Sequence, residues 1–449
     1  MSQKSSLSLF SAVNLVAASM IGAGVYTTSG FTLADLGSPG RVIAAWMVGG
    51  MIALCGAISY GALASRFAAS GGEYLFLSRA VHPAAGYVAG FVSILAGFTG
   101  ATAIAATAFE SYFPKWGVLA QWPEGAIATL AIVVAASLHG VYSRLGTPVQ
   151  DAMVVLKFLM LALFLIVAAK SFPSGWRGLE PATTAPLRWP AFAVSLMWIS
   201  LSYSGFNAAI YVAAEVRQPR VNVAKSLWIG TLVVTLLYVL LNIVFVFAPA
   251  LEEISGQKEI AVIAARSISG PAFESLIRAV LLVSLATSVS AMMMTGPRVY
   301  AKMADDGALP GWFRFQTQAP TMAVAMQALL AIAVVQISQL KELLSYLGFT
   351  LSVSAALTVA TLFWLRYRGE SIAVPFYPWP PLVFVAATLM VAAIAGYQQP
   401  LECTAGLLTL ALGLVVYWSG LGSSSLGGNP IRADELADES LADADPDHY

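Results

Sequence analysis

Long apolar runs alternate with short polar segments along this chain. Most runs have about 20 residues or more, the length that an α-helix needs to cross roughly 30 Å of hydrocarbon. The pattern therefore predicts an all-α, polytopic membrane protein with twelve transmembrane helices. The runs cover residues 9–34, 41–66, 83–110, 125–143, 149–169, 190–214, 223–249, 271–300, 321–339, 343–366, 380–397 and 401–420.

The first run contains a pair of glycines, Gly22 and Gly24, near its middle. Glycine weakens the interior of a helix, and an unpaired backbone group in hydrocarbon costs several kcal/mol. A broken spanning helix is therefore tolerated only where it is buried in protein or lines a watery cavity. Transporters contain such cavities, so we expect this interruption to lie in a transport pathway.

A second polar interruption, Ser200–Asn207, lies in the sixth run, five spans after the first. Interrupted segments at matching positions of two halves point to a midplane binding site in an inverted-repeat transporter. Helices 1–5 (residues 9–169) and helices 6–10 (residues 190–367) would form the two repeats, with helices 11–12 (residues 380–420) outside them. The alternative is that both interruptions are small-residue packing faces between helices.

Composition supports a bilayer setting. The chain is 58% hydrophobic and 10% charged, against roughly 25% charged residues in a soluble domain. The formal net charge is zero, so no nucleic-acid partner is indicated. Cys55 and Cys403 lack metal or redox spacing. His82 and His139 show no ligand spacing and are expected in loops. No metal or other cofactor is predicted.

The basic residues predict the orientation. With both termini in the cytoplasm, cytoplasmic segments hold thirteen Lys and Arg residues and the opposite side holds nine. The expected location is the cell membrane, with residues 1–8 as a cytoplasmic N-terminus. Residues 421–449 are acidic and lack apolar periodicity, so they are expected to form a disordered cytoplasmic tail.

Four motifs resemble those of the amino acid, polyamine and organocation (APC) transporter superfamily, in its order and spacing. They are Ile21–Tyr26, Ser70–Ala80, Tyr203–Arg220 and Gly296–Pro310. Within the superfamily the chain is most similar to L-type amino acid transporters and their bacterial permease relatives. The resemblance implies a five-plus-five inverted repeat, discontinuous helices 1 and 6, and an amino acid substrate.

The two interruptions offer backbone groups that suit a zwitterion. N–H groups of a half-helix that begins near Gly24 suit a carboxylate, and carbonyls left free by the interruptions suit an ammonium. No acidic residue lies near either interruption, which favours neutral L-amino acids. The expected substrate-binding residues are Met20, Ile21, Gly22, Ala23, Gly24, Leu201, Ser202, Ser204 and Gly205.

Two residues depart from the superfamily pattern. Ala23 stands where relatives usually carry a hydroxyl, so one hydrogen bond to the carboxylate is lost, worth roughly 1–3 kcal/mol. Leu201 stands where relatives carry an aromatic side chain over the substrate. Trp198 or Phe206 is an alternative cap.

Lys157 lies in the strongly apolar stretch Val154–Leu161 of the fifth run. An ammonium there costs at least roughly 2.5–3.5 kcal/mol, so it should face the bundle and have a partner. The resemblance places such a lysine beside the first-helix interruption, where it would replace a coupling ion by bonding carbonyls near Gly22. The alternative is a lysine that snorkels to the cytoplasmic edge.

Mechanistic alternatives remain open at this stage. The motifs favour a secondary active transporter that works by alternating access, either as an amino acid exchanger or as a proton-coupled symporter. A channel or sensor on the same fold, or an intramembrane enzyme, is the alternative. The chain lacks a nucleotide-binding glycine loop and a recurring catalytic set, so no enzyme activity is expected. Neither cysteine is placed to tie a partner chain, so none is expected.

Overall fold

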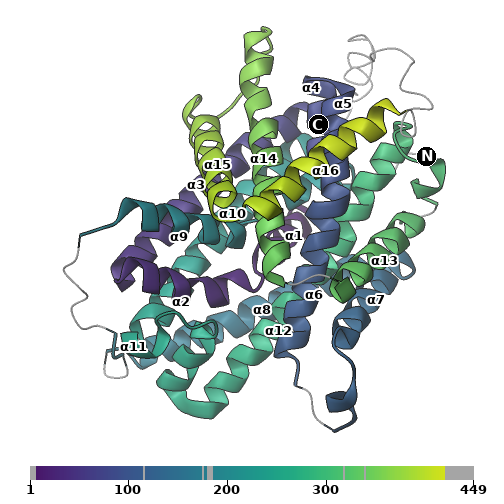
Figure 1. Cartoon of the computed structure of the whole chain (residues 1–449). Coiled ribbons are helices and arrows are strands. Elements are labelled where there is room, and N and C mark those ends of the chain that lie inside the picture. Colours follow the sequence, from purple (N-terminus) through teal and green to yellow (C-terminus); the bar gives the residue numbers. More distant parts are fainter. Residues whose placement is uncertain are drawn as a thin grey trace, which may run out of the picture.

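The structure is a computed structural model that describes residues 7–114, 117–173, 176–178, 186–316, 319–337 and 340–419. The predicted acidic tail, residues 421–449, lies outside these ranges, as do residues 1–6. Every regular element of the described part is a helix (Figure 1). The described part of the chain is thus all-helical, as its apolar runs predict.

The helices follow the predicted runs. In chain order they are α1 (Leu9–Met20), α2 (Gly24–Leu36), α3 (Pro39–Arg66), α4 (Gly72–Ala80), α5 (Pro83–Val92), η1 (Ser93–Gly100), α6 (Ala101–Tyr112), η2 (Gly117–Gln121), α7 (Ala126–Gly140), α8 (Ser143–Lys170), α9 (Trp189–Ser202), η3 (Ala208–Glu215), α10 (Pro219–Phe247), α11 (Leu251–Ile254), α12 (Ile260–Asp305), η4 (Gly311–Phe313), α13 (Thr321–Ile337), α14 (Leu340–Tyr367), α15 (Trp379–Gln398) and α16 (Pro400–Trp418).

Their length and hydropathy identify a multi-pass membrane protein. Among the described residues, eight helices are long and apolar enough to cross a membrane. A ninth span comes from α1 and α2 together, which are bent by 43° at the residues between them. Three shorter apolar helices, α7, α9 and α13, cover other predicted runs.

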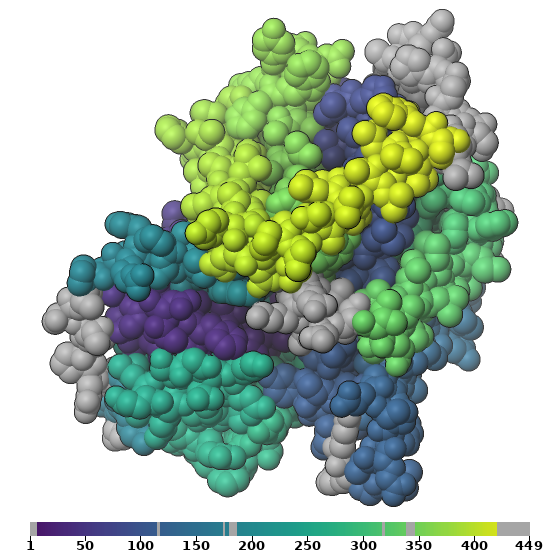
Figure 2. Space-filling view, viewed as in Figure 1, coloured from purple at the N-terminus to yellow at the C-terminus, as the bar shows by residue number. Residues whose placement is uncertain are grey.

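The helices pack around α10, which lies along α1 and α3. Trp46 of α3 is fully buried there, with its ring 5.4 Å from that of Tyr238 on α10 and 5.8 Å from that of Tyr203. By contrast, α16 runs obliquely across the outer face and is largely exposed (Figure 2). The interrupted helices α1, α2 and α9 therefore pack against the central helices α3 and α10.

Besides the interrupted first and sixth spans, two further spans deviate from a plain α-helix. The third is wound as a π-helix between α5 and α6, over Ser93–Gly100. The eighth is kinked at Ser269 and Gly270, directly before the predicted start of that span at residue 271. One sequence expectation is wrong: His139 lies in the last turn of α7, where it is buried and hydrogen-bonded to Ser290 of α12 at 2.8 Å.

Candidate functional site

The first break, residues 21–23, separates α1 from α2. Ile21 leaves helical geometry (φ −79°, ψ 84°), and the Gly22 N–H bonds the Met20 carbonyl at 2.9 Å. The N-terminus of α2 has no side-chain cap. Because the first N–H groups of a helix lack intrahelical acceptors, this end of α2 presents donors and a positive dipole end toward the break.

The second break, residues 203–207, follows α9. Gly205 adopts φ +96°, in the left-handed region that glycine tolerates best. The chain then resumes as the 3₁₀ helix η3 rather than as an α-helix. At the end of α9 the Leu201 carbonyl accepts the Ser204 N–H at 3.2 Å, which leaves the Ser202 carbonyl for a side-chain donor.

The structure brings the two breaks together. A β-carbon added at Gly24 would lie 2.4 Å from Ser202 Oγ, and one added at Gly205 would lie 2.7 Å from the Ser19 carbonyl oxygen. Both distances are far below van der Waals contact. The glycines thus permit a backbone approach that no other residue allows, and the Ser19 hydroxyl, which is buried there, has no hydrogen-bond partner among the described residues.

Tyr238 of α10 links the two breaks. Its hydroxyl lies 2.6 Å from the Met20 carbonyl oxygen and 3.0 Å from the Ser202 carbonyl oxygen. A phenol has one proton, so the two carbonyls share a single donor. Two of the carbonyls that the sequence assigns to an ammonium therefore converge on one side chain.

Lys157 is connected to the first break through α12. Its side chain is fully buried, and the ammonium donates to Thr287 Oγ1 of α12 at 3.0 Å. The next residue, Ser288, has its hydroxyl 3.2 Å from the Ala18 carbonyl oxygen and 3.3 Å from that of Ile21. In this conformation Lys157 bonds Thr287, and the neighbouring Ser288 bonds the carbonyls at the break. The sequence instead led us to expect a direct bond between the lysine and those carbonyls.

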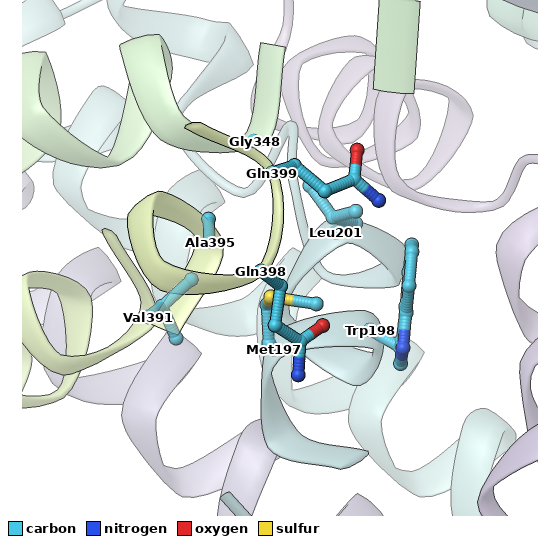
Figure 3. Close-up of a pocket in the computed structure, with 8 residues that line it drawn as sticks. All are labelled: Met197, Trp198, Leu201, Gly348, Val391, Ala395, Gln398 and Gln399. Atoms are coloured by element: carbon cyan, nitrogen blue, oxygen red, sulfur yellow. The ribbon is translucent and has the colours of Figure 1, made fainter. Parts of the chain in front are cut away.

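Leu201, at the end of α9, packs against α14. It lines a pocket between α9, α14 and α15, and one of its methyl groups lies 3.0 Å from where Gly348 would carry a β-carbon. Figure 3 shows the residues that line this pocket: Met197, Trp198, Leu201, Gly348, Val391, Ala395, Gln398 and Gln399.

The remaining predicted residues differ in burial. Met20, Ile21 and Ser202 are buried, whereas Gly22, Ala23 and Gly24 are half-buried and Ser204 is exposed. Phe206, offered above as an alternative cap, instead packs against Tyr60 and Phe384, with ring centres 5.5 and 5.6 Å apart. Trp198 lines the same pocket as Leu201.

The end of η3 is tied to residue 7 and to α12, and these contacts together are called the closure below. Leu7 pairs with Val216 as an isolated parallel bridge, with Leu7 N–H bonded to the Glu215 carbonyl at 2.8 Å. The Glu215 carboxylate accepts two bonds from the Arg298 guanidinium of α12, at 2.5 and 3.0 Å. The pair is largely buried, so the two charges satisfy each other where water is scarce.

Sequence reasoning missed several residues that the fold places around the breaks. Tyr238, Thr287 and Ser288 lie inside apolar runs, where tyrosines and hydroxyls commonly serve helix packing. Asp151 of α8 accepts hydrogen bonds from Ser11 at 2.7 Å and Asn14 at 3.2 Å, and so ties α8 to α1. Asp151 lies only six residues before Lys157, and a carboxylate so close to a buried lysine is the one sequence signal that could have pointed to this region.

Known proteins resemble this chain over nearly its whole length. The large neutral amino acids transporter small subunit 2 of Rattus norvegicus is 26% identical, over 93% of this chain and 81% of the relative. The serine/threonine exchanger SteT of Bacillus subtilis is 23% identical, over 92% and 96%. The human cystine/glutamate transporter is 24% identical, over 92% and 85%.

All three relatives are transporters and none is an enzyme, which agrees with the absence of a catalytic set from the sequence. The model of the amino acid permease family matches residues 7–418, a range that includes both breaks, the first eleven apolar runs and most of the twelfth. The match covers most of the chain, so the protein belongs to the amino acid permease family, within the APC superfamily.

Proposed function

We propose that this protein moves neutral L-amino acids across the cell membrane as a secondary active transporter with alternating access. The observation that carries the proposal is the meeting of the two breaks, where α2 presents uncapped N–H groups and the Met20 and Ser202 carbonyls converge on Tyr238. A carboxylate and an ammonium find complementary groups within one small region. The names of the relatives support an amino acid as the cargo.

In this proposal the substrate carboxylate binds the N–H groups around Gly22, Ala23 and Gly24. The ammonium binds carbonyls at the ends of α1 and α9, those of Met20, Ile21 and Ser202 first, with Leu201, Ser204 and Gly205 completing the surroundings. No acidic side chain lies within either break. Glu73 meets the second break through Asn207 but already accepts three hydrogen bonds. A cationic substrate side chain would therefore lack a free carboxylate partner, which favours neutral substrates.

The membrane arrangement belongs to the same proposal. Twelve spans are proposed from eight long apolar helices, the bent α1–α2 pair and three shorter apolar helices, which lie along the predicted runs. We assign residues 9–169 and 190–367 to two inverted repeats of five helices, with residues 380–420 added outside. The distribution of basic residues favours cytoplasmic termini, which places the closure at Glu215 and Arg298 on the cytoplasmic side.

Lys157 is the proposed coupling residue. It reaches the first break through Thr287 and Ser288, so its ammonium supports the position of α12 against α1. A fixed charge at this place would replace an inorganic cation. The chain is then either an obligatory exchanger or a symporter in which this lysine releases and regains a proton.

We further propose that no obligatory partner chain is needed. One relative is named a small subunit, which describes that protein. In this chain Cys55 is half-buried in α3 and Cys403 is buried in α16. A thiol in either place is not presented to a second chain.

Counterflow in proteoliposomes tests the proposal. Purified protein would be reconstituted with or without internal L-leucine, and separately L-serine, and uptake of the same radiolabelled amino acid would be followed. Saturable uptake that is accelerated by internal amino acid indicates exchange, and uptake driven by an inward proton gradient into empty vesicles indicates symport. Uptake that never saturates would favour a channel, and no uptake of any neutral amino acid would contradict the proposed substrate class.

A further inference from the structure

Glu73 is a buried carboxylate outside the substrate site. It lies in the first turn of α4, between the second and third spans, and only 6% of its surface is exposed. Glu73 Oε1 accepts bonds from Tyr60 at 3.0 Å and Asn207 at 2.7 Å, and Oε2 accepts one from Tyr211 at 2.8 Å. The three donors come from α3, the second break and η3.

Two glycines bring η3 close to α4. Gly71 and Gly72 adopt φ +130° and +57°, and a β-carbon at Gly72 would lie 2.2 Å from Tyr211 Cε1. The Tyr211 ring also meets the edge of Phe98, with ring centres 4.9 Å apart. Tyr211 is therefore seated tightly, and its hydroxyl can shift only if η3 or α4 moves.

The donors around Glu73 are neutral, and every donor hydrogen in the cluster is used. Asn207 gives one hydrogen to Glu73 and one to the Tyr211 oxygen, and each tyrosine gives its single hydrogen to Glu73. Three incoming bonds to the two oxygens suit a carboxylate anion. Protonation would turn one of these acceptor oxygens into a donor, so the incoming bond at that oxygen would be lost or reversed.

Most charged groups on the neighbouring elements have partners of their own. Lys302 of α12 pairs with Asp306 at 2.6 Å, and Tyr74 of α4 donates to the same Asp306 at 3.0 Å. Arg298 pairs with Glu215, and Arg66 of α3 pairs with Glu370. Arg366 and Arg368 of α14 lie over the rings of Tyr377 and Trp364, and Arg79 lies in the last turn of α4 itself. Residues 83–92 of α5 carry no charge. Burial therefore raises the pKa of the Glu73 carboxyl, against the lowering effect of its hydrogen bonds.

We propose that Glu73 is a proton-binding site that controls the cytoplasmic closure of the transport pathway. As an anion it ties α4 to the second break and η3. When it takes a proton from cytoplasmic water, one oxygen becomes a hydroxyl and at least one of the three incoming bonds is lost. Since η3 ends at Glu215, loosening it also loosens the Glu215–Arg298 pair and the Leu7–Val216 bridge.

This inference rests on the proposed transport function, but its test does not require transport. A single cysteine at Ala209, which is fully buried two residues before Tyr211, would report the opening of η3. Cys55 and Cys403 would first be replaced by alanine. The rate of N-ethylmaleimide labelling of the reconstituted protein would be measured between about pH 5 and pH 8, the range over which a carboxyl with a raised pKa titrates.

Glu73→Gln and Tyr211→Phe give opposite signatures. The glutamine is neutral and loses one incoming bond, so the rate of labelling at pH 8 should rise roughly 5- to 30-fold. The change in labelling rate with pH that comes from titration of Glu73, called the Glu73 step, should disappear. Tyr211→Phe keeps the carboxyl but removes a donor to its anion, so the step should move to higher pH. If the glutamine variant does not fold, the shift of the labelling step to higher pH in Tyr211→Phe is the test of the proposal.

Glu370→Gln is the matched control, because Glu370 is an exposed carboxylate in a surface pair with Arg66. Every protein in the series carries the same cysteine, so the intrinsic pH dependence of the thiol cancels. A labelling profile in Glu73→Gln that equals the Glu370→Gln profile would overturn the proposal, as would an unmoved step in Tyr211→Phe. Failure of counterflow with a normal Glu73 step would instead count against the transport function alone.

Discussion

At the scale of single residues, the absence of a side chain at Gly24 is what allows the two breaks to touch. Gly24→Val should abolish transport, because the added β-carbon would lie 2.4 Å from Ser202 Oγ and a β-branched residue resists the break. Uptake by the purified variant would be compared with Gly396→Val, where an added β-carbon meets nothing closer than Cys403 Sγ at 4.0 Å. Equal uptake by both would remove the first break from the mechanism.

Substitutions of Lys157 should affect stability and transport differently. Its buried ammonium has one described hydrogen bond, to Thr287, so Lys157→Met should keep or raise the melting temperature in detergent while transport falls sharply. Lys157→Arg keeps the charge but not the compact shape, and should also be impaired. A snorkelling lysine would tolerate arginine, so wild-type rates in both variants would exclude the coupling role.

Leu201 tests where the substrate side chain lies. Leu201→Phe restores an aromatic group and should tighten neutral amino acids by no more than roughly 1–2 kcal/mol of buried apolar area, about a tenfold change in KM. The larger ring would enter the pocket that Leu201 shares with Gly348 of α14 and Ala395 of α15. Competition by a series of neutral amino acids gives the measurement, and an identical series in both proteins would place residue 201 away from the substrate.

At the scale of elements, apolar length predicts the spans and glycine spacing predicts both breaks, because each depends on residues adjacent in sequence. The partners across the breaks follow from packing between distant helices. Tyr238 and Thr287 stand 218 and 130 residues from the groups they bond, and no local pattern marks them. Nor does the sequence show that Leu201 turns toward α14, which depends on Gly348 being small.

The link between η3 and α12 is a pair of opposite charges. Arg298→Glu alone should lose most transport, because it places two carboxylates together in a poorly hydrated site. The exchanged pair, Arg298→Glu with Glu215→Arg, should recover part of it. Recovery stays incomplete because Arg298 also donates to the Met294 carbonyl of its own helix. A double-mutant cycle on uptake rates measures the coupling, and additive losses would mean that the pair does not act as a closure.

At the scale of the whole molecule, the proposed orientation predicts which loops face outward. Ser255, after α11, and Ser371, after α14, are both exposed and lie in loops of opposite predicted sides. In a cysteine-free background, Ser255→Cys should react with a membrane-impermeant maleimide on intact cells, and Ser371→Cys only after permeabilisation. The reverse pattern would invert the topology and place the Glu215–Arg298 closure outside.

The shared hydroxyl of Tyr238 has a consequence for how the carrier returns across the membrane. One proton serves two carbonyls on opposite breaks, so any motion that separates the breaks removes this donor from one of them. The Met20 carbonyl keeps the Gly22 N–H at 2.9 Å, so the larger loss falls on the Ser202 carbonyl. A bare buried acceptor costs roughly 1–3 kcal/mol, which slows such a step about 5- to 150-fold. A substrate ammonium brings three protons and removes that deficit. We therefore expect the substrate-bound carrier to reorient faster than the empty carrier. This difference in rate favours exchange of one amino acid for another over net uptake.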